Sequence, residues 1–406
     1  MTNHFYDPYR ILTRVYSDGA HLKIALSEEP IEELHRARTT KTVYGVLEND
    51  AYLNYCIRSL AQKAPKQSVR TVLKIALYHL IFLKKAKYAV TDTAVELLKK
   101  LGKGGTAGFA NALLRAFDEE NIRLPAGDEG LAIRYNYPLF AVKKLKAQYG
   151  ARAEAIMGAK SGGVSVRFVS GAEEYLQLPH TKTPFPNVYL FEKFTRDGNF
   201  FEGKYTFQSV GSVAVASVVE PCENLLDACA APGGKSVLLS ERCKKVTACE
   251  LHEHRAELIK SYLTRMKANN VEVVQCDSSL FRPEWEGAFD AVLCDVPCSG
   301  LGTLAENPDL ALTKKEEDLK GLNETQLTIA RNCARYVKKG GSLYYATCSV
   351  LEEENDGIVE KLLLETGLKA VEAESPLAHD TTRFGLQFLP DKAFGAGFYV
   401  ARLKKI

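Results

Sequence analysis

Residues 224–236 read Asn-Leu-Leu-Asp-Ala-Cys-Ala-Ala-Pro-Gly-Gly-Lys-Ser, and this stretch decides the fold. Its apolar beginning predicts a strand over 224–228, and Ser236 begins a predicted helix that ends at Arg242. Between them, Gly233 and Gly234 allow the backbone to turn sharply and to approach a ligand where a Cβ would clash. A strand, a glycine turn and a helix in this order predict a ligand site at the end of the strand.

Strands and helices alternate through the rest of the chain after Pro221. Short apolar runs predict further strands at 246–250, 271–276, 289–294, 342–347 and 398–403. Helical spacing predicts helices at 254–267, 316–337 and 355–364. Such alternation builds a mostly parallel sheet covered by helices on both faces, so an α/β domain is predicted for residues 208–406.

The first 122 residues follow a helical pattern instead. Apolar residues recur every three or four positions, as in Leu53, Ile57 and Leu60 and again in Leu73, Leu77 and Leu80. A later helix is predicted over 94–101, with Thr91 or Asp92 as its N-cap, followed by glycines and a last helix through 109–114. Residues 1–122 are therefore predicted to form an all-α domain.

Residues 123–207 are predicted to form a linker helix and a small α/β module. A basic amphipathic helix is expected from Pro138 to Ala159, and short strands are expected at 164–169 and 188–191. Prolines and glycines mark the turns around these strands.

Charge is segregated along the chain, although the net charge is only +3. Residues 51–103 carry eleven Lys or Arg against Asp92 and Glu96, and residues 131–168 carry seven against Glu154. Basic faces of this kind attract a polyanion such as a nucleic acid. A solvated helical surface explains the charge equally well, so charge alone leaves both interpretations open.

The ten cysteines do not form a recognisable disulfide or zinc pattern. Nine of them lie between Cys222 and Cys348 at irregular spacings, and no pair of CxxC motifs occurs. We expect free thiols in a reducing compartment and no metal site. The apolar runs are too short to cross a membrane and the N-terminus does not resemble a signal peptide, so a cytoplasmic protein without membrane contact is expected.

Polar residues stand at the predicted ends of five successive strands: Asp227, Glu250, Asp277, Asp295 and Cys348. The turn at 227–236 is not a Walker A loop, which would need glycine where Cys229 stands, and it has no GxGxxG dinucleotide fingerprint. Carboxylates suit a nucleoside ligand without a polyphosphate, Glu250 accepting from ribose hydroxyls and Asp277 from an adenine amino group. S-adenosylmethionine, with its cationic sulfonium, is the predicted cofactor; acidic loop caps without a ligand are the alternative.

Two cysteines, Cys298 and Cys348, follow strands at the same predicted edge. The C5 atom of a pyrimidine is a poor nucleophile, but a thiolate that adds to C6 creates an enamine whose C5 attacks a methyl sulfonium. A second group must then remove the C5 proton. This chemistry requires two reactive groups beside the cofactor, which two loop cysteines can provide. Packing in the core is the alternative, and it is the preferred interpretation for Cys229, Cys276 and Cys294.

These motifs resemble the RsmB/Sun branch of the Nol/Nop/Sun family of RNA cytosine-C5 methyltransferases. The sequences at 227–235, 295–302 (Asp-Val-Pro-Cys-Ser-Gly-Leu-Gly) and 345–349 (Tyr-Ala-Thr-Cys-Ser) stand in the family's order and spacing. Residues 75–80 and 111–115 resemble segments of the NusB-like RNA-binding domain that this branch carries. The resemblance implies a NusB-like all-α domain over 1–122, a small α/β RNA-binding module within 123–207, and a Rossmann-like S-adenosylmethionine-dependent methyltransferase domain over 208–406.

The resemblance also implies residue roles, which chemistry alone leaves open for the two thiols. Cys348 is implied as the nucleophile, and Cys298 as the group that assists product release. Asp295 is expected to hydrogen-bond the target base, and Lys235 to favour the reactive thiolate. The implied cofactor-binding residues are Cys229, Ala230, Ala231, Pro232, Gly233, Gly234, Lys235, Glu250, Asp277 and Asp295.

The implied substrate is a cytosine in small-subunit (16S) ribosomal RNA, and the enzyme is expected to act as a monomer. Transfer RNA is the alternative substrate, and a catalytically silent NusB-like RNA-binding factor or a small-molecule methyltransferase is the alternative protein class. The chain departs from the family pattern where Ala305 and Glu306 replace arginines, Ser209 replaces aspartate and Glu352 replaces proline. The first departure is expected to weaken contact with RNA phosphate.

Overall fold

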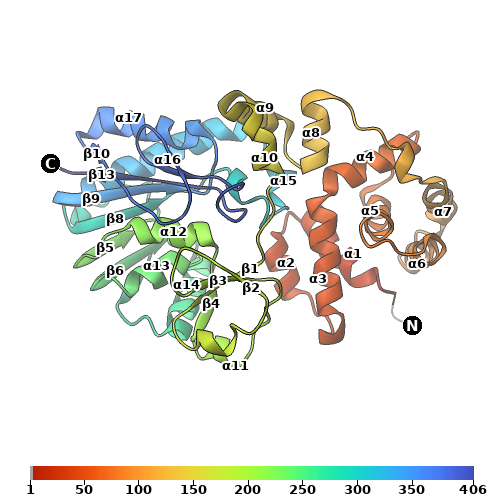
Figure 1. The fold of residues 1–406 in the computed structure, drawn as a ribbon, viewed down its shortest axis with the longest axis horizontal. Coiled ribbons are helices and arrows are strands. Elements are labelled where there is room, and N and C mark those ends of the chain that lie inside the picture. The colour runs from red at the N-terminus through yellow and green to blue at the C-terminus, as the bar shows by residue number, and fades with distance from the viewer. Residues whose placement is uncertain (1–2) are drawn as a thin grey trace. The chain divides into compact units, whose positions relative to one another are not determined.

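The computed structural model describes residues 3–406, which form two compact units (Figure 1). The first unit contains the chain up to Lys143 together with residues 307–314, and the second contains residues 144–306 and 315–406. The predicted domain boundaries at 122/123 and 207/208 stay predictions. None of the helices within residues 3–406 is both long and apolar enough to cross a membrane.

The first unit is all-α, which confirms the prediction for this part of the chain. Its α-helices are α1 (Tyr6–Ser17), α2 (Leu22–Glu28), α3 (Glu33–Glu48), α4 (Asp50–Leu60), α5 (Gln67–Ile81), α6 (Lys87–Lys100), α7 (Ala107–Ala116), α8 (Gly127–Tyr135), the beginning of α9 and the short α15 (Leu310–Thr313). Helix α5 is the centre of the core, because most of its side chains are buried and it contacts α1, α3, α4, α6 and α7. Asp309 ties residues 307–314 to this unit by accepting a hydrogen bond from the Leu22 N–H at 3.2 Å.

The predicted N-cap of α6 is wrong. The helix begins at Lys87, so Thr91 lies inside it, buried, and its hydroxyl donates to the carbonyl of Lys87 at 2.8 Å. The buried stripe of the helix begins at Val90 and continues through Ala94, Leu97 and Leu98. Burial of Val90 favours the additional first turn, whereas an N-cap at Thr91 or Asp92 would have started the helix after Val90.

The second unit contains the predicted parallel sheet. Its parallel strands are β5 (Asn224–Asp227), β6 (Lys245–Glu250), β7 (Val271–Gln275), β8 (Phe289–Asp295) and β9 (Val337–Thr347), in the order β9-β8-β5-β6-β7. The antiparallel strand β13 (Phe398–Lys404) pairs with β9 and begins an extension formed by β10 (Lys369–Val371), β11 (Asp380–Thr381) and β12 (Leu386–Phe388). The chain runs outward in opposite directions from β5 and β8, which makes their ends a switch point where ligands bind in such sheets.

Helices cover both faces of this sheet, as predicted (Figure 1). Helices α12 (Val210–Val218), α13 (Gly234–Ser240) and α14 (Glu253–Met266) lie on one face, and α16 (Glu316–Tyr336) and α17 (Asp356–Thr366) lie on the other. Helix α12 is not predicted from the sequence, because this Val- and Ala-rich helix is buried on nearly all sides and has no polar face. Strands β10, β11 and β12 are not predicted either, because they are only two or three residues long.

A small antiparallel sheet precedes the large one. Its strands are β1 (Val164–Phe168), β2 (His180–Lys182), β3 (Val188–Phe191) and β4 (Tyr205–Phe207), in the order β2-β3-β1-β4. The strands predicted at 164–169 and 188–191 correspond to β1 and β3. The single helix predicted from Pro138 to Ala159 is wrong: α9 (Leu139–Tyr149) ends before Gly150, whose φ of 56° breaks the helix, and α10 (Ala153–Gly158) follows.

Candidate active site

The five predicted strand-end residues meet at one edge of the parallel sheet. Strands β5, β6 and β8 end at Asp227, Glu250 and Asp295. Asp277 follows β7 by two residues, and Cys348 directly follows β9. Because these strands are parallel neighbours, the structure brings all five residues to the edge that contains the switch point.

The glycine turn of residues 229–235 connects β5 to α13 at this edge. The Ala230 N–H donates to the carbonyl of Cys249 on β6 at 2.8 Å, and the Gly233 N–H donates to the carbonyl of Ala230 at 2.7 Å. The peptide bond between Ala231 and Pro232 is cis. Gly233 has a φ of 104°, a conformation that strains any residue with a Cβ, so glycine is required there.

The acidic residues of the edge offer acceptors that suit a nucleoside with a positive charge. Asp227 is buried, and although its Oδ2 accepts from the Ser236 hydroxyl at 2.6 Å, its Oδ1 has no partner among the described residues. Burial raises the pKa of Asp227 to about 6. A buried acceptor without a donor is costly unless a ligand satisfies it, so this part of the site fits a bound cofactor.

Glu250 is the last residue of β6, and Asp277 lies two residues beyond β7. Glu250 accepts the His252 N–H at 3.0 Å through Oε1 and lies 3.7 Å from the Arg255 guanidinium. Asp277 Oδ1 accepts from both the backbone N–H and the hydroxyl of Ser279. In both residues these bonds occupy one carboxylate oxygen and orient the group, and an ionised carboxylate has further acceptor positions for a ligand.

Lys235 and Asp295 form an ion pair at the switch point. The Lys235 Nζ lies 2.7 Å from Asp295 Oδ2, and both side chains are largely buried. Burial opposes the ammonium charge, but the neighbouring Asp295 carboxylate outweighs it and raises the pKa of Lys235. Lys235 therefore places a fixed positive charge at the edge, 5.5 Å from the ring centre of Phe398.

Cys298 and Cys348 lie side by side, as their positions after β8 and β9 predicted. Their Sγ atoms are 3.0 Å apart, and the Cys348 N–H donates to Cys298 Sγ at 3.3 Å. Both are free, partly exposed thiols. The hydrogen bond with Cys348, together with burial, raises the pKa of Cys298 well above the usual range. The structure therefore brings the two thiols into direct contact at the same sheet edge as the acidic strand ends.

The residues that hold this site together are not among those predicted from the sequence. Hydroxyl and amide groups around the two cysteines donate hydrogen bonds to Glu354, which is fully buried. Asn355 holds the Cys348 loop, because its side chain accepts from the Thr347 hydroxyl and donates to the Ser349 carbonyl. Gln208 links Arg167 of the small sheet to the carbonyl of Gly234. The available signal was the run of three glutamates at 352–354, which follows the apolar residues Val350 and Leu351, since a charged residue that is buried needs a partner.

One departure from the family pattern has a clear structural outcome. Ser209 is the N-cap of α12, and its hydroxyl accepts the Ser212 N–H at 3.2 Å. Serine and aspartate are comparable N-caps, so this substitution preserves the start of the helix.

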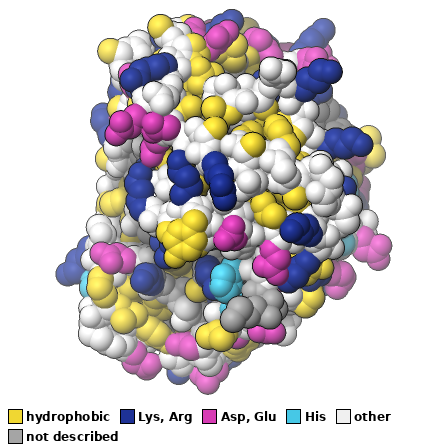
Figure 2. All heavy atoms as spheres, turned by 90° about the vertical axis from the view of Figure 1, so that its right-hand side faces the viewer, with side chains coloured by type: hydrophobic (Ala, Val, Ile, Leu, Met, Phe, Trp, Pro, Cys, Tyr) yellow, Lys and Arg dark blue, Asp and Glu magenta, His cyan; other side chains and the backbone are white. Residues whose placement is uncertain are grey.

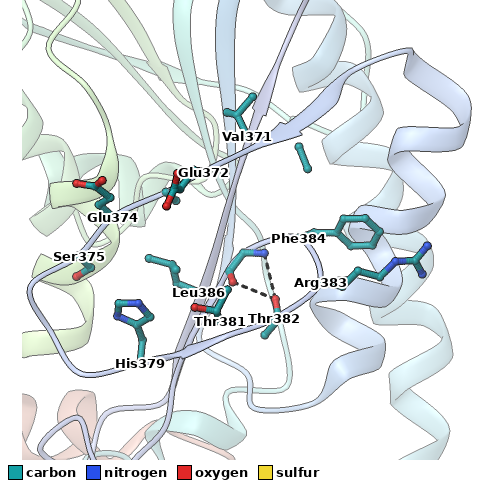
Figure 3. A pocket seen from close by; sticks show the side chains of 13 residues that line it. Val371, Glu372, Glu374, Ser375, His379, Thr381, Thr382, Arg383, Phe384 and Leu386 are labelled. Atoms are coloured by element: carbon teal, nitrogen blue, oxygen red, sulfur yellow. Dashed lines mark hydrogen bonds between the residues drawn. The ribbon is translucent and has the colours of Figure 1, made fainter.

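A separate pocket of about 540 Å³ lies at the antiparallel extension (Figure 3). It is lined by residues of 370–386, among them His379, Arg383 and Phe384, and includes none of the predicted site residues. Within residues 3–406, no group of three or more His, Cys, Asp or Glu side chains is arranged to hold a metal ion.

The fold and the strand-end site define a Rossmann-like methyltransferase of the kind that uses S-adenosylmethionine. Comparison with protein families then gives the particular family. Residues 216–404 match the model of 16S rRNA methyltransferase RsmB/F, and residues 9–119 match that of the NusB family. Residues 216–404 thus form a methyltransferase domain of the RsmB/F family and residues 9–119 a helical domain of the NusB family, which confirms the resemblance predicted from the motifs.

Named relatives match nearly the whole chain. The probable ribosomal RNA small subunit methyltransferase B of Bacillus subtilis (strain 168) is 29% identical, over 95% of this chain and 94% of the relative. The ribosomal RNA small subunit methyltransferase B of Serratia proteamaculans (strain 568) is 28% identical, over 97% and 96%.

Solved structures share the fold. The crystal structure of PH0851 matches with a TM-score of 0.84 and 21% identity, over 100% of this chain and 99% of that chain. NSun6 from Pyrococcus horikoshii with SFG matches with a TM-score of 0.58 and 18% identity, over 66% of this chain and 98% of that chain.

Proposed function

We propose that this protein methylates C5 of a cytosine in small-subunit ribosomal RNA, with S-adenosylmethionine as methyl donor and Cys348 as covalent nucleophile. The observation that carries the proposal is the pair of thiols, 3.0 Å apart, at the edge where the acidic strand ends and the glycine turn meet. An enzyme that methylates a nucleophilic nitrogen or oxygen needs no such pair. The names of the relatives favour ribosomal RNA over transfer RNA.

Some residues at this sheet edge would bind the cofactor, and others would bind the target base. The glycine turn 229–235, Glu250 and Asp277 would hold S-adenosylmethionine, which supplies an electrophilic methyl group. Asp295 would accept a hydrogen bond from the exocyclic amine of cytosine, while Lys235 balances its charge. The target base must leave any stack that it occupies in order to enter the site.

The two thiols act in sequence. The Cys348 thiolate forms a bond with C6 of cytosine, and the electron pair displaced toward C5 makes that carbon a nucleophile for the methyl group. The C5 proton must then leave, and the Cys348–C6 bond breaks as the aromatic ring is restored. Cys298, which lies against the attacking sulfur, is placed to assist this release.

Nucleoside analysis of 16S rRNA tests this function. Purified protein, S-adenosylmethionine and unmodified 16S rRNA should yield 5-methylcytidine, and bisulfite sequencing should locate it at a single position that is unmodified in a strain without the gene. Methylation of transfer RNA alone would replace the proposed substrate. Binding of RNA without methylation of either substrate would support the silent RNA-binding alternative.

Asp277→Ala is expected to weaken S-adenosylmethionine binding by about 10-fold, because a hydrogen bond to a charged group contributes roughly 1.5–3 kcal/mol. The matched control is Glu272→Ala, which removes an exposed carboxylate from β7 that pairs with Lys245 at 3.2 Å. Isothermal titration of both variants measures the difference. Equal affinities for the two variants would exclude Asp277 from the cofactor site.

Charge reversal at Lys85 is expected to flatten the salt dependence of RNA binding, reducing its slope by about one phosphate contact. Lys85 is exposed between α5 and α6, whereas Lys84 pairs with Glu119 and Lys87 donates to the Phe117 carbonyl. Figure 2 views the side of Figure 1 on which α6 and α7 lie, and basic side chains gather there in a short row beside exposed hydrophobic ones.

Filter-binding titrations with 16S rRNA at several salt concentrations measure the slope. Lys244→Glu is the control, because this lysine is also exposed and precedes β6, at the sheet edge opposite the strand-end site. The same slope for Lys85→Glu and the unaltered protein would favour a solvated helical face.

A further inference from the structure

A buried carboxylate joins the two loops that carry the cysteines. Glu354 is fully buried, and its Oε2 accepts hydrogen bonds from the hydroxyls of Ser299, at 2.5 Å, and Ser349. Each of these serines directly follows one of the cysteines in the sequence. The same carboxylate therefore contacts the residue next to Cys298 and the residue next to Cys348.

The remaining acceptor positions of Glu354 hold the Cys298 loop alone. Its Oε1 accepts the Ser299 N–H at 2.7 Å and the Gln326 side-chain amide at 3.0 Å. Gln326 also donates to the carbonyl of Pro297, the residue before Cys298, at 3.0 Å. All four acceptor positions of the carboxylate are thus used, and all four donors are uncharged.

Stability alone does not account for such a group. Burying an ionised carboxylate costs free energy that hydrogen bonds recover only in part, and a well-packed apolar side chain is often as stable or more stable. Glutamates at the preceding positions show the ordinary outcome: Glu352 is exposed, and Glu353 pairs with Lys144 at 2.9 Å. Glu354 differs because it connects two loops that are 50 residues apart in the sequence.

We propose that Glu354 is a positioning residue that holds the Cys298 and Cys348 loops together, so that both sulfurs meet the same base. Its catalytic consequence rests on the proposed function, but its effect on the distance between the sulfurs does not. Its negative charge lies beside Cys298 and also contributes to keeping that thiol protonated.

The distance between the sulfurs is measured by disulfide formation. Diamide accepts two electrons and two protons from a pair of thiols, forming a disulfide and a hydrazine, and the rate depends on how often the sulfurs meet. Peptide mapping by mass spectrometry follows the Cys298–Cys348 pair. The Cys222–Cys243 pair, whose sulfurs are 3.4 Å apart, serves as a reference within the same molecule.

Two variants test the contact, Glu354→Gln and Ser349→Ala. In the first, the serine hydroxyls lose a charged acceptor, and in the second, the Cys348 loop loses its serine bond to Glu354. Each variant should slow the Cys298–Cys348 disulfide by about 10-fold, the factor expected for losing one hydrogen bond to a charged group. The Cys222–Cys243 rate should stay unchanged, as should both rates in the matched control Glu353→Gln.

Methylation of 16S rRNA gives the second readout. A displacement of about 1 Å in a reacting group costs roughly 100-fold in rate, so kcat should fall by about that factor in Glu354→Gln. The KM for S-adenosylmethionine should stay within about twofold, because the cofactor residues are untouched. A loss confined to KM would instead place Glu354 with the cofactor and overturn the proposal.

The outcomes separate the two claims. Unaltered disulfide rates in both variants would overturn the positioning role, whatever the activity of the enzyme. If the variants form the Cys298–Cys348 disulfide more slowly but the unaltered protein fails to methylate RNA, the positioning role is supported and the proposed function is contradicted. If Glu354→Gln does not fold, which a change in the Cys222–Cys243 rate would reveal, Ser349→Ala decides the question.

Discussion

Cys348→Ala is expected to abolish methyl transfer and to form no covalent complex with RNA. Removal of a nucleophile reduces turnover by roughly 10⁴-fold or more. Cys298→Ala should still attack and methylate the base, but release should fail, so a protein–RNA adduct should accumulate. The 3.0 Å contact between the sulfurs is the reason, because only the neighbour of the attacking thiol is placed to assist its departure.

Denaturing gel electrophoresis with cofactor and 16S rRNA distinguishes the two variants. Cys276→Ala is the matched control: it removes a partly exposed thiol that follows β7 at the same sheet edge. The hydrogen bond with Cys249 lowers the pKa of Cys276, so this control removes a thiol whose ionisation its surroundings favour. Normal activity of Cys276→Ala would show that the position of a thiol in the site decides whether it acts as the nucleophile. An adduct in Cys348→Ala and none in Cys298→Ala would reverse the two roles.

Lys235→Met is expected to reduce both activity and stability strongly. It leaves the Asp295 carboxylate unpaired in a largely buried site, and breaking a buried ion pair in this way costs about 3–5 kcal/mol. Methylation should fall by at least about 100-fold, because preorganised charge at the reacting base is removed. Urea unfolding and kcat, measured separately, report the two effects.

Lys392→Met provides the comparison. Lys392 pairs with Asp380 at 3.1 Å, but its side chain is half exposed, and exposed pairs contribute no more than about 1 kcal/mol. The double variant Lys235→Met with Asp295→Asn should lose less unfolding free energy than the two single variants lose together, since the two residues act as a unit. Additive losses would mean that Lys235 and Asp295 act independently.

The parts of this protein that could be predicted are those that short stretches of sequence determine by themselves. The turn requires glycine at Gly233, and the cysteines follow strands that are apolar and regular, so both could be recognised before their surroundings were known. The alternation of β5 to β9 with helices likewise predicted the sheet and placed its ligand edge.

The support of the site could not be predicted in the same way. Positions 352, 353 and 354 are all glutamate, so residue type does not distinguish them. Only the packing of the 3₁₀ turn over 352–354 against the Cys298 and Cys348 loops turns Glu354 inward. Burial at Val90, rather than a polar cap, extends α6 by a turn. Such features depend on contacts between segments that are distant in sequence.

The central claim is a covalent bond between Cys348 and C6 of a cytosine in small-subunit rRNA. The most direct measurement uses 16S rRNA transcribed with 5-fluorocytidine, whose C5–F bond prevents release after methylation. Mass spectrometry of the digested complex should find one methylated fluorocytidine attached to the peptide that contains Cys348. A nucleotide on the Cys298 peptide, or methylated RNA with no attached peptide, would contradict this account.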